Sequence, residues 1–320
     1  LSNTCLSRAC ERIGAIWYQT GLVEPAQALA YLIEQHELPG KKRQVSYFVT
    51  YPSYLGQVVE CGLAAGYGPA DFGVERISVG GELVSNGLKM RAQQLFGPVA
   101  FSEGYAMTET WPTVASLCEQ GHLHFEISQA MWEVIEPESK RPAQADEAGV
   151  LVVTPLPPYR MTTLLLRYNT EDLVRPLSEP LTCALRHMPA TSNLLGKLKL
   201  AVRHEQGWTY PRDVVEALEA VEEVPLPARW GYWAAPGGVA VEVVVRSDSR
   251  ATQRKIEEAL QAHGVPVQIL YLVLNPQRLH HHIPLRCDLR ELDFAPPKLP
   301  ASPARAQMVD SRALLLRAKG

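Results

Sequence analysis

The sequence has no run of about 18 apolar residues, which argues against a membrane span. It also lacks a basic excess, because 31 Lys and Arg residues stand against 34 Asp and Glu residues and the formal net charge is -3. A dedicated nucleic-acid-binding protein usually carries such an excess, so we expect neither nucleic acid nor a membrane as a partner. The six cysteines in 320 residues are too sparse for a disulfide scaffold and indicate a reducing, cytoplasmic setting.

The first residues lack the features of a natural start. The chain opens with Leu1-Ser-Asn-Thr4 in place of Met, and it has no charged segment followed by an apolar one, as a signal peptide has. We therefore expect the printed sequence to be the interior of a longer protein.

Helical and strand-like patterns alternate over the first 180 residues, which favours an α/β fold with a largely buried sheet. Hydrophobic residues make up 46% and charged residues 20%, as in ordinary globular proteins. We expect three helices: one over 24–35, one that follows a turn at 51–54 and reaches residue 64, and one over 85–95. We expect strands over 45–49, 76–79, 99–101, 122–127, 131–135, 149–154 and 163–168.

The composition changes near residues 180–196, where a loop with prolines precedes Gly196. We place a domain boundary there, between a large domain over 1–193 and a small domain over 194–320. The second part reads as strand, helix, strand, helix and strand over 198–203, 211–222, 239–246, 251–262 and 267–274. This order predicts a small α+β domain with helices on one face of an antiparallel sheet. An extended proline-rich tail over 295–304 follows.

Three separated motifs carry residues that suit a nucleotide site. They are Ser78-Val-Gly80-Gly81-Glu82 at a strand end, Glu103-Gly-Tyr105-Ala-Met-Thr108-Glu109, and Leu166-Arg-Tyr168-Asn-Thr170-Glu-Asp172-Leu. The glycines lack a Cβ and let the backbone approach a ligand, although each motif taken alone is as well explained by a turn or a polar surface. Their order and spacing resemble the adenylate-forming superfamily, and most of all its phenylacetate-CoA ligase branch.

That branch is also similar at Thr50-Tyr-Pro52-Ser53-Tyr54, and the resemblance runs from about residue 8 to 310. It implies the remainder of a large adenylate-forming domain followed by a small, mobile C-terminal domain. It also implies roles for the motif residues. Adenine would lie between Gly80-Gly81-Glu82 and Tyr105, Thr108 would face the α-phosphate of ATP, Glu109 would help hold Mg²⁺, and Asp172 would accept hydrogen bonds from the ribose.

Several positions depart from the family pattern. A phosphate loop of the type S-S-G-T-T-G occurs nowhere in the 320 residues, and Glu171 replaces a glycine beside Asp172. Lys197 stands where the family has a hinge arginine at the nucleotide, and an ammonium lacks the planar fork of a guanidinium. Arg305 aligns with the family's catalytic lysine. These changes keep open a catalytically degenerate homologue that binds a nucleotide or a partner protein.

Relatives in this branch often carry a zinc site, and Cys118, His124 and Cys183 fall in the corresponding segments. Thiolate and imidazole suit Zn²⁺, but a tetrahedral structural site needs four ligands, and the fourth stays open. A buried cysteine beside a strand histidine is the alternative interpretation. The run at 280–282 is expected to be a solvated loop, because contiguous residues of an extended chain point to alternating sides.

The function implied by the resemblance is ATP-dependent activation of a carboxylic acid, aryl or acyl, as an acyl-adenylate. The acyl group then passes to a thiol such as coenzyme A. A carrier-protein thiol is an alternative acceptor, and a homodimer is left open. If the resemblance holds, Tyr105, Thr108, Glu109 and Asp172 should converge on one cleft, with Gly80 and Gly81 on its other wall.

Overall fold

The structure is a computed structural model that describes residues 2–178, 180–281 and 283. The predicted tail over 295–304 and the proposed catalytic Arg305 lie outside the described residues. A first helix, α1 (Ser2–Arg12), precedes α2 (Pro25–Ile33). Within the part that is described, no helix is both long and apolar enough to cross a bilayer.

Six strands form the first sheet, in the order β1 (Tyr47–Thr50), β2 (Arg76–Val79), β3 (Ala100–Ala106), β4 (Val114–Leu117), β5 (Leu123–Phe125) and β9 (Ala190–Thr191). The strands β1, β2 and the start of β3 are parallel, and the later pairs are antiparallel. Parallel neighbours need crossover connections, which α3 (Pro52–Ala64) and α4 (Asn86–Phe96) supply. Helix α4 begins at Ser85, whose hydroxyl accepts a hydrogen bond from the Leu88 N–H at 2.9 Å.

A second, antiparallel sheet has the order β10 (Gly196–Lys197), β8 (Tyr168–Val174), β7 (Gly149–Pro155) and β6 (Ala130–Ile135). The predicted strand over 163–168 is wrong, because β8 begins only at Tyr168. Thr163 and Arg167 have positive φ angles of 52° and 49°, which an extended strand does not allow. The apolar side chains that prompted the prediction, Leu164 and Leu166, are exposed.

The remaining chain forms a hairpin of β11 (Val202–His204) and β12 (Gly207–Thr209), helices α5 (Pro211–Glu219) and α6 (Arg250–Ala262), and a sheet of β13 (Trp230–Ala235), β14 (Gly238–Val244) and β15 (Val267–Val273). The expectation of an antiparallel sheet is wrong in part. Strand β13 is antiparallel to β14, but β15 is parallel to β14, because α6 carries the chain back across the sheet. The expected strand over 198–203 is also shorter, since residues 198–200 form a 3₁₀ turn.

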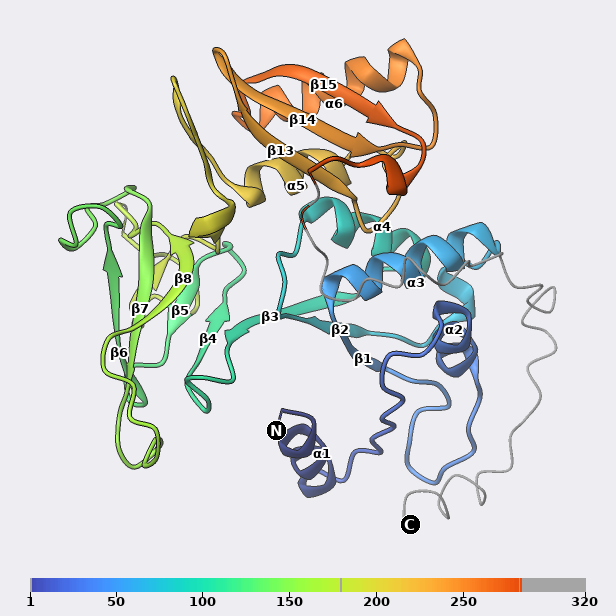
Figure 1. Cartoon of the computed structure of the whole chain (residues 1–320). Coiled ribbons are helices and arrows are strands. Elements are labelled where there is room, and N and C mark those ends of the chain that lie inside the picture. The colour runs from blue at the N-terminus through green and yellow to red at the C-terminus, as the bar shows by residue number, and fades with distance from the viewer. Residues whose placement is uncertain (1, 179, 282, 284–320) are drawn as a thin grey trace.

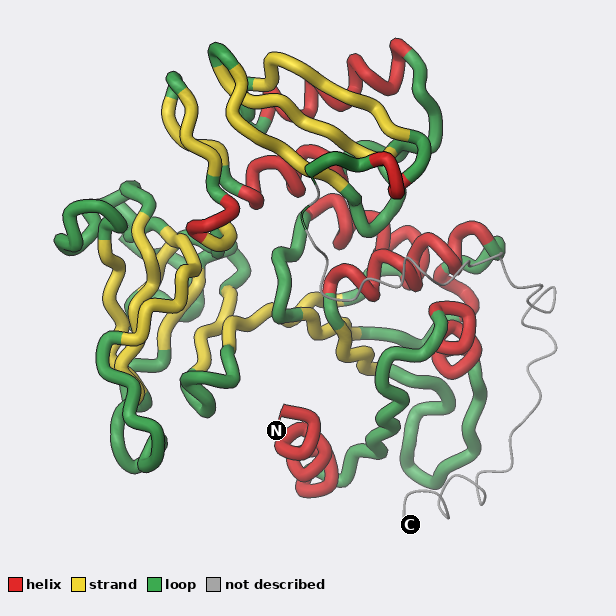
Figure 2. Tube along the Cα trace, in the orientation of Figure 1, coloured by secondary structure: helices red, strands yellow, loops and turns green. Residues whose placement is uncertain are grey.

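The helices α3 and α4 lie between the central strands and the sheet of β13 to β15 (Figure 1). Figure 2 shows the strands of β13 to β15 set apart from the strands of the first two sheets. Apolar side chains of α3, α4 and β2, such as Leu55, Ile77 and Leu88, are almost completely buried in the first core. A separate core fills the space between α5, α6 and β13 to β15. The predicted fold class, α/β followed by a small α+β part, is confirmed.

Candidate functional site

Two of the predicted nucleotide motifs meet at the carboxyl ends of β2 and β3. Val79 pairs with Glu103 in parallel register, which places the next residues, Gly80 and Gly104, side by side. A Cβ on Gly80 would lie 3.3 Å from the Gly104 carbonyl oxygen. The absence of side chains here therefore lets the two strand ends approach closely. Gly81 follows with a φ of 88°, a left-handed conformation that favours glycine and turns the chain away from the sheet.

Tyr105 and Asp172 lie within hydrogen-bonding distance, although 67 residues separate them in the sequence. The Tyr105 hydroxyl donates to Asp172 Oδ2 at 2.8 Å. Lys197 stands opposite Asp172 in the β8–β10 pair, and its Nζ lies 3.0 Å from Asp172 Oδ1 while donating to the Thr170 carbonyl at 2.7 Å. Both carboxylate oxygens of Asp172 thus have a partner within the protein.

This trio, Tyr105, Asp172 and Lys197, is partly shielded from water. Tyr105 and Asp172 are each 7% exposed. Burial, and then the negative charge of Asp172, raise the pKa of the Tyr105 hydroxyl well above its ordinary value. The phenol therefore remains protonated at neutral pH and acts as a donor to the carboxylate.

Tyr105, which is the member of the trio that lines it, borders a small hollow of about 30 Å³ next to the end of β2. Its lining includes residues of the first two motifs, of the loop before β10 and of α5, namely Val79, Gly80, Glu82, Val84, Glu103, Gly104, Tyr105, Leu117, Leu123, Asn193, Leu194 and Arg212. A water molecule needs roughly 10 to 15 Å³ measured in this way, whereas ligand pockets measure about 300 to 1,000 Å³. The hollow in this conformation admits water and excludes a nucleobase.

The other predicted nucleotide and magnesium residues take different positions. Glu82 accepts a hydrogen bond from the Ser53 N–H at 2.8 Å through Oε2, so its carboxylate stabilises the positive N-terminus of α3. Thr108 and Glu109 are exposed in the turn that follows β3. The structure therefore brings Gly80, Tyr105, Asp172 and Lys197 together and leaves Thr108 and Glu109 facing solvent.

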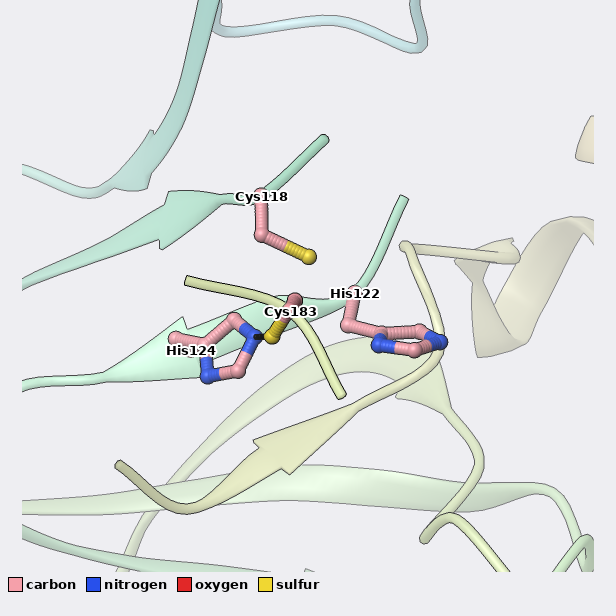
Figure 3. A group of neighbouring side chains, drawn as sticks. All are labelled: Cys118, His122, His124 and Cys183. Carbon is pink, nitrogen blue, oxygen red and sulfur yellow. Dashed lines mark hydrogen bonds between the residues drawn. The ribbon is translucent and has the colours of Figure 1, made fainter. Parts of the chain in front are cut away.

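A second group of polar side chains lies where the β4–β5 hairpin meets the segment before β9 (Figure 3). Cys118, His122, His124 and Cys183 each offer one ligand atom, and these four atoms all lie within 4.8 Å of one another. With Zn–S near 2.3 Å and Zn–N near 2.0 to 2.1 Å, ligand atoms of a tetrahedral zinc site lie roughly 3.3 to 3.8 Å apart. The four residues, named here the Cys₂His₂ cluster, have the number and types of ligands that such a site requires.

The neighbours of His124 favour a role as ligand. Its Nε2 lies 3.2 Å from Cys183 Sγ, and its Nδ1 lies 3.4 Å from the Met188 carbonyl oxygen. A proton on Nδ1 directed at that carbonyl leaves the Nε2 lone pair facing the cluster, which is the usual support for a metal-binding histidine. Burial lowers the pKa of His124 and keeps the imidazole neutral at pH 7.

The fourth member of the cluster, His122, was not among the residues predicted from the sequence. The signal was its spacing from His124, because residues two apart in a strand point to the same face. The run at 280–282 does not contribute to the cluster among the described residues. Instead the backbone N–H groups of His280 and His281 donate to the buried carboxylate of Glu242.

The sequence and the structure of this chain were compared with those of known proteins. No protein-family model matches the chain. Phenylacetate-coenzyme A ligase of Thermus thermophilus is 29% identical over 178 residues, which cover 54% of this chain and 39% of that protein.

Two solved structures show the same fold. A 2-hydroxyisobutyryl-CoA ligase in the postadenylation state, in complex with 2-HIB-AMP, matches with a TM-score of 0.65 and 17% identity, covering 87% of this chain and 60% of that one. An anthranilate CoA ligase in complex with anthranoyl-AMP matches with a TM-score of 0.58 and 12% identity, covering 82% and 51%. The chain spans less than two thirds of the length of each of these proteins. The chain therefore has the fold of these CoA ligase structures, and about half of its sequence is similar to part of a phenylacetate-coenzyme A ligase.

Proposed function

We propose that this chain is the nucleotide-binding and C-terminal part of a ligase that activates a carboxylic acid with ATP. The acid would form an acyl-adenylate and pass to the thiol of coenzyme A. The observation that carries the proposal is the position of Tyr105, which lines the hollow together with Gly80 and donates a hydrogen bond to Asp172 of β8. The similar proteins are named as CoA ligases, which supports coenzyme A over a carrier-protein thiol.

Each residue at the site has a role that follows from its chemistry. The Tyr105 ring would stack on adenine, while the backbone at Gly80 and Gly81 leaves room for the opposite face of the base. Asp172 would exchange Lys197 and the Tyr105 hydroxyl for the two ribose hydroxyls, since a carboxylate prefers to accept a pair of hydrogen bonds. Lys197, released from Asp172, would supply positive charge to the ribose or phosphate.

The metal and phosphate roles are proposed for Thr108 and Glu109. Mg²⁺ in ATP-using enzymes is usually held by one or two carboxylates together with substrate phosphates and water, and the single exposed carboxylate of Glu109 fits that pattern. The ion would offset charge on the phosphates. The Thr108 hydroxyl would donate to the α-phosphate from the same exposed turn.

We further propose that the Cys₂His₂ cluster holds a structural Zn²⁺. Its ligands come from the β4–β5 hairpin and from Cys183, which lies 59 residues beyond His124. An ion shared between the two segments would fix the hairpin to the chain that leads into β9. Free thiols at Cys118 and Cys183 fit a reducing compartment, which supports a cytoplasmic location.

A degenerate nucleotide-binding homologue is the second candidate function. It is favoured by the two internal partners of Asp172 and by the small volume of the hollow. The absence of an S-S-G-T-T-G type loop from the 320 residues also predicts slow acyl-adenylate formation by this chain alone, because the transferring phosphates lack those N–H donors.

Calorimetry with two ligands distinguishes the candidates. The ligands are AMP and the non-hydrolysable analogue 5'-O-(N-phenylacetylsulfamoyl)adenosine, in which a sulfamate replaces the phosphate. A ligase should bind the analogue at least about 10-fold more tightly than AMP, because intermediate analogues also engage the acid pocket. Equal affinities would instead support the degenerate homologue. If Asp172→Ala binds both ligands as tightly as the wild type, the proposed nucleotide site is wrong.

A further inference from the structure

The helix α5 reaches the hollow at the proposed nucleotide site. Its second residue, Arg212, lines the same small space as Gly80, Glu82 and Tyr105, although it is far from them in the sequence. The Arg212 side chain is 14% exposed. A long, largely buried cationic side chain therefore borders the space where the proposed function places a nucleoside.

Arg212 is held there by contacts from three directions. Its Nε donates to the Leu194 carbonyl, and its Nη1 donates to the Val84 carbonyl at 3.2 Å. The same nitrogen lies 2.9 Å from Glu216 Oε1 on the next turn of α5. Burial lowers the pKa of the guanidinium, while the negative charges of Glu216 and Glu103 oppose that change. The charge of Arg212 is thus satisfied by the protein itself.

The position of α5 is fixed by polar contacts with the start of α4. The Ser85 hydroxyl donates to the buried carboxylate of Glu219, and the Asn86 N–H donates to Glu216 Oε2 at 2.9 Å. The next residue, Gly87, lies so close to the Glu219 carbonyl that a Cβ on Gly87 would overlap it. The two helices therefore meet backbone to backbone at this point, next to the glycine motif that precedes α4.

A third set of contacts lies further along the same interface. Arg91 of α4 donates to the Val224 carbonyl at 2.8 Å. Glu60 of α3 is bonded to Arg91, to Arg246 and, at 2.9 Å, to the Leu226 N–H. Ion pairs that combine burial with several hydrogen bonds specify a particular arrangement of the parts that they join. The contacts of Glu219 thus join α5 to α4, and those of Arg91 and Glu60 join the segment that follows α5 to α4 and α3.

We propose that docked α5 is an autoinhibitory plug, in which Arg212 occupies the adenosine pocket and must leave before a nucleotide binds. The inference rests on the proposed nucleotide site. Binding to a protein that populates the competent state only in part weakens the apparent affinity by that fraction. Removing the plug, or weakening its docking, therefore increases the affinity for AMP.

Two variants test the plug by different routes. Arg212→Ala removes the side chain from the hollow and leaves the contacts of Ser85 and Asn86 with α5 in place. Glu219→Gln leaves Arg212 intact and weakens the docking between α5 and α4. Arg254→Ala, on the exposed face of α6, is the matched control, because its guanidinium contacts Glu258 at the surface. Thermal melting of each variant establishes that it is folded.

The measurement is AMP binding by calorimetry, together with hydrogen exchange at the amides of α4 and α5. We expect Arg212→Ala and Glu219→Gln to bind AMP about 10-fold or more tightly than the wild type, as a shift from a mostly closed population requires. In Glu219→Gln, faster exchange at α5 should accompany the change.

Two results overturn the plug and are distinguishable from each other. Equal AMP affinity in the wild type and both variants overturns the plug and leaves the proposed function standing. Binding by none of the proteins, with faster exchange in Glu219→Gln, overturns the plug and the nucleotide site together.

Discussion

The trio of Tyr105, Asp172 and Lys197 differs from the Cys₂His₂ cluster in how its polar side chains are paired. In the cleft, the carboxylate of Asp172 faces the ammonium of Lys197 and the hydroxyl of Tyr105, so each group has a partner within the chain. In the Cys₂His₂ cluster, two cysteines and two histidines each bring one ligand atom to within 4.8 Å of the others, and no carboxylate or ammonium belongs to the group. The first arrangement is complete without a ligand, whereas the second would be completed by the proposed Zn²⁺.

The largest effect should come from removing the metal. Cys183→Ala should lower the zinc content from about one per chain to near zero and cost about 4 kcal/mol of the free energy of unfolding, the value for a ligand present at 1,000 times its Kd. Metal analysis and urea unfolding measure the two effects. Cys61→Ala is the control, since that thiol is free and lies outside the cluster. A wild-type protein that carries no zinc after purification without chelator contradicts the assignment.

A smaller loss should follow from Asp172→Ala. The change removes the carboxylate that accepts from the buried Tyr105 hydroxyl, while Lys197 keeps the Thr170 carbonyl as an acceptor. A buried polar group that loses its partner costs about 1 to 3 kcal/mol. Urea unfolding provides the measurement. Glu171→Gln is the control, because Glu171 is next to Asp172 in the sequence and its side chain is exposed. If both variants unfold at the same urea concentration as the wild type, the internal partners of Asp172 do not stabilise the fold.

The contribution of Glu219 to the free energy of unfolding should depend on pH. Burial raises the pKa of this carboxyl above its ordinary value of 4.5, against the opposing effects of Ser85, the Ala228 N–H and Arg91, while Glu216 adds to the rise. The folded protein then binds a proton that the unfolded chain has released. The contribution of Glu219 to stability is therefore full below pH 4.5 and is lost as the pH rises through the folded pKa.

Unfolding free energies from pH 4 to 8 test this linkage. The difference between wild type and Glu219→Gln should change in favour of the variant as the pH rises, because the amide does not titrate. A constant difference across this range would show that burial does not shift the carboxyl.

The smallest effect is expected from Lys197→Arg. The charge opposite Asp172 is kept, and Lys197 is 39% exposed, so a longer side chain can be accommodated. The free energy of unfolding should change by less than about 0.5 kcal/mol, as for most surface substitutions. A loss larger than that for Asp172→Ala, measured in the same urea series, would contradict the view that the ammonium acts mainly through its charge.

Local signals predicted much of the fold. The strand over 76–79 has the predicted bounds, since β-branched residues alternate there before the glycine pair. The helix predicted over 85–95 likewise agrees closely with α4, which Ser85 caps. The strand over 163–168 failed because positive φ angles at Thr163 and Arg167 depend on the loop around them. The parallel pairing of β15 was also missed, since the path of α6 across the sheet has no signal in either strand.

The candidate site was predictable only as far as its residue types. The motifs pointed to Tyr105 and Asp172, but their direct hydrogen bond depends on the packing of β3 against β8, which no short pattern reports. Arg212 gave no signal at all. Its position depends on how α5 meets α4 over a sequence separation of more than 100 residues. Long-range docking of this kind is the part of the site that sequence reasoning could not supply.

The contact at Gly87 has a consequence for how this protein tolerates substitution. Because the glycine meets the main chain of α5, the distance between the helices is independent of which side chains α5 carries. Substitutions of exposed side chains along α5 should therefore leave this main-chain contact in place. Any side chain at position 87 would set a larger minimum separation for the whole helix. A methyl group at this position, as in Gly87→Ala, should therefore push α5 away from α4 and change the position of Arg212.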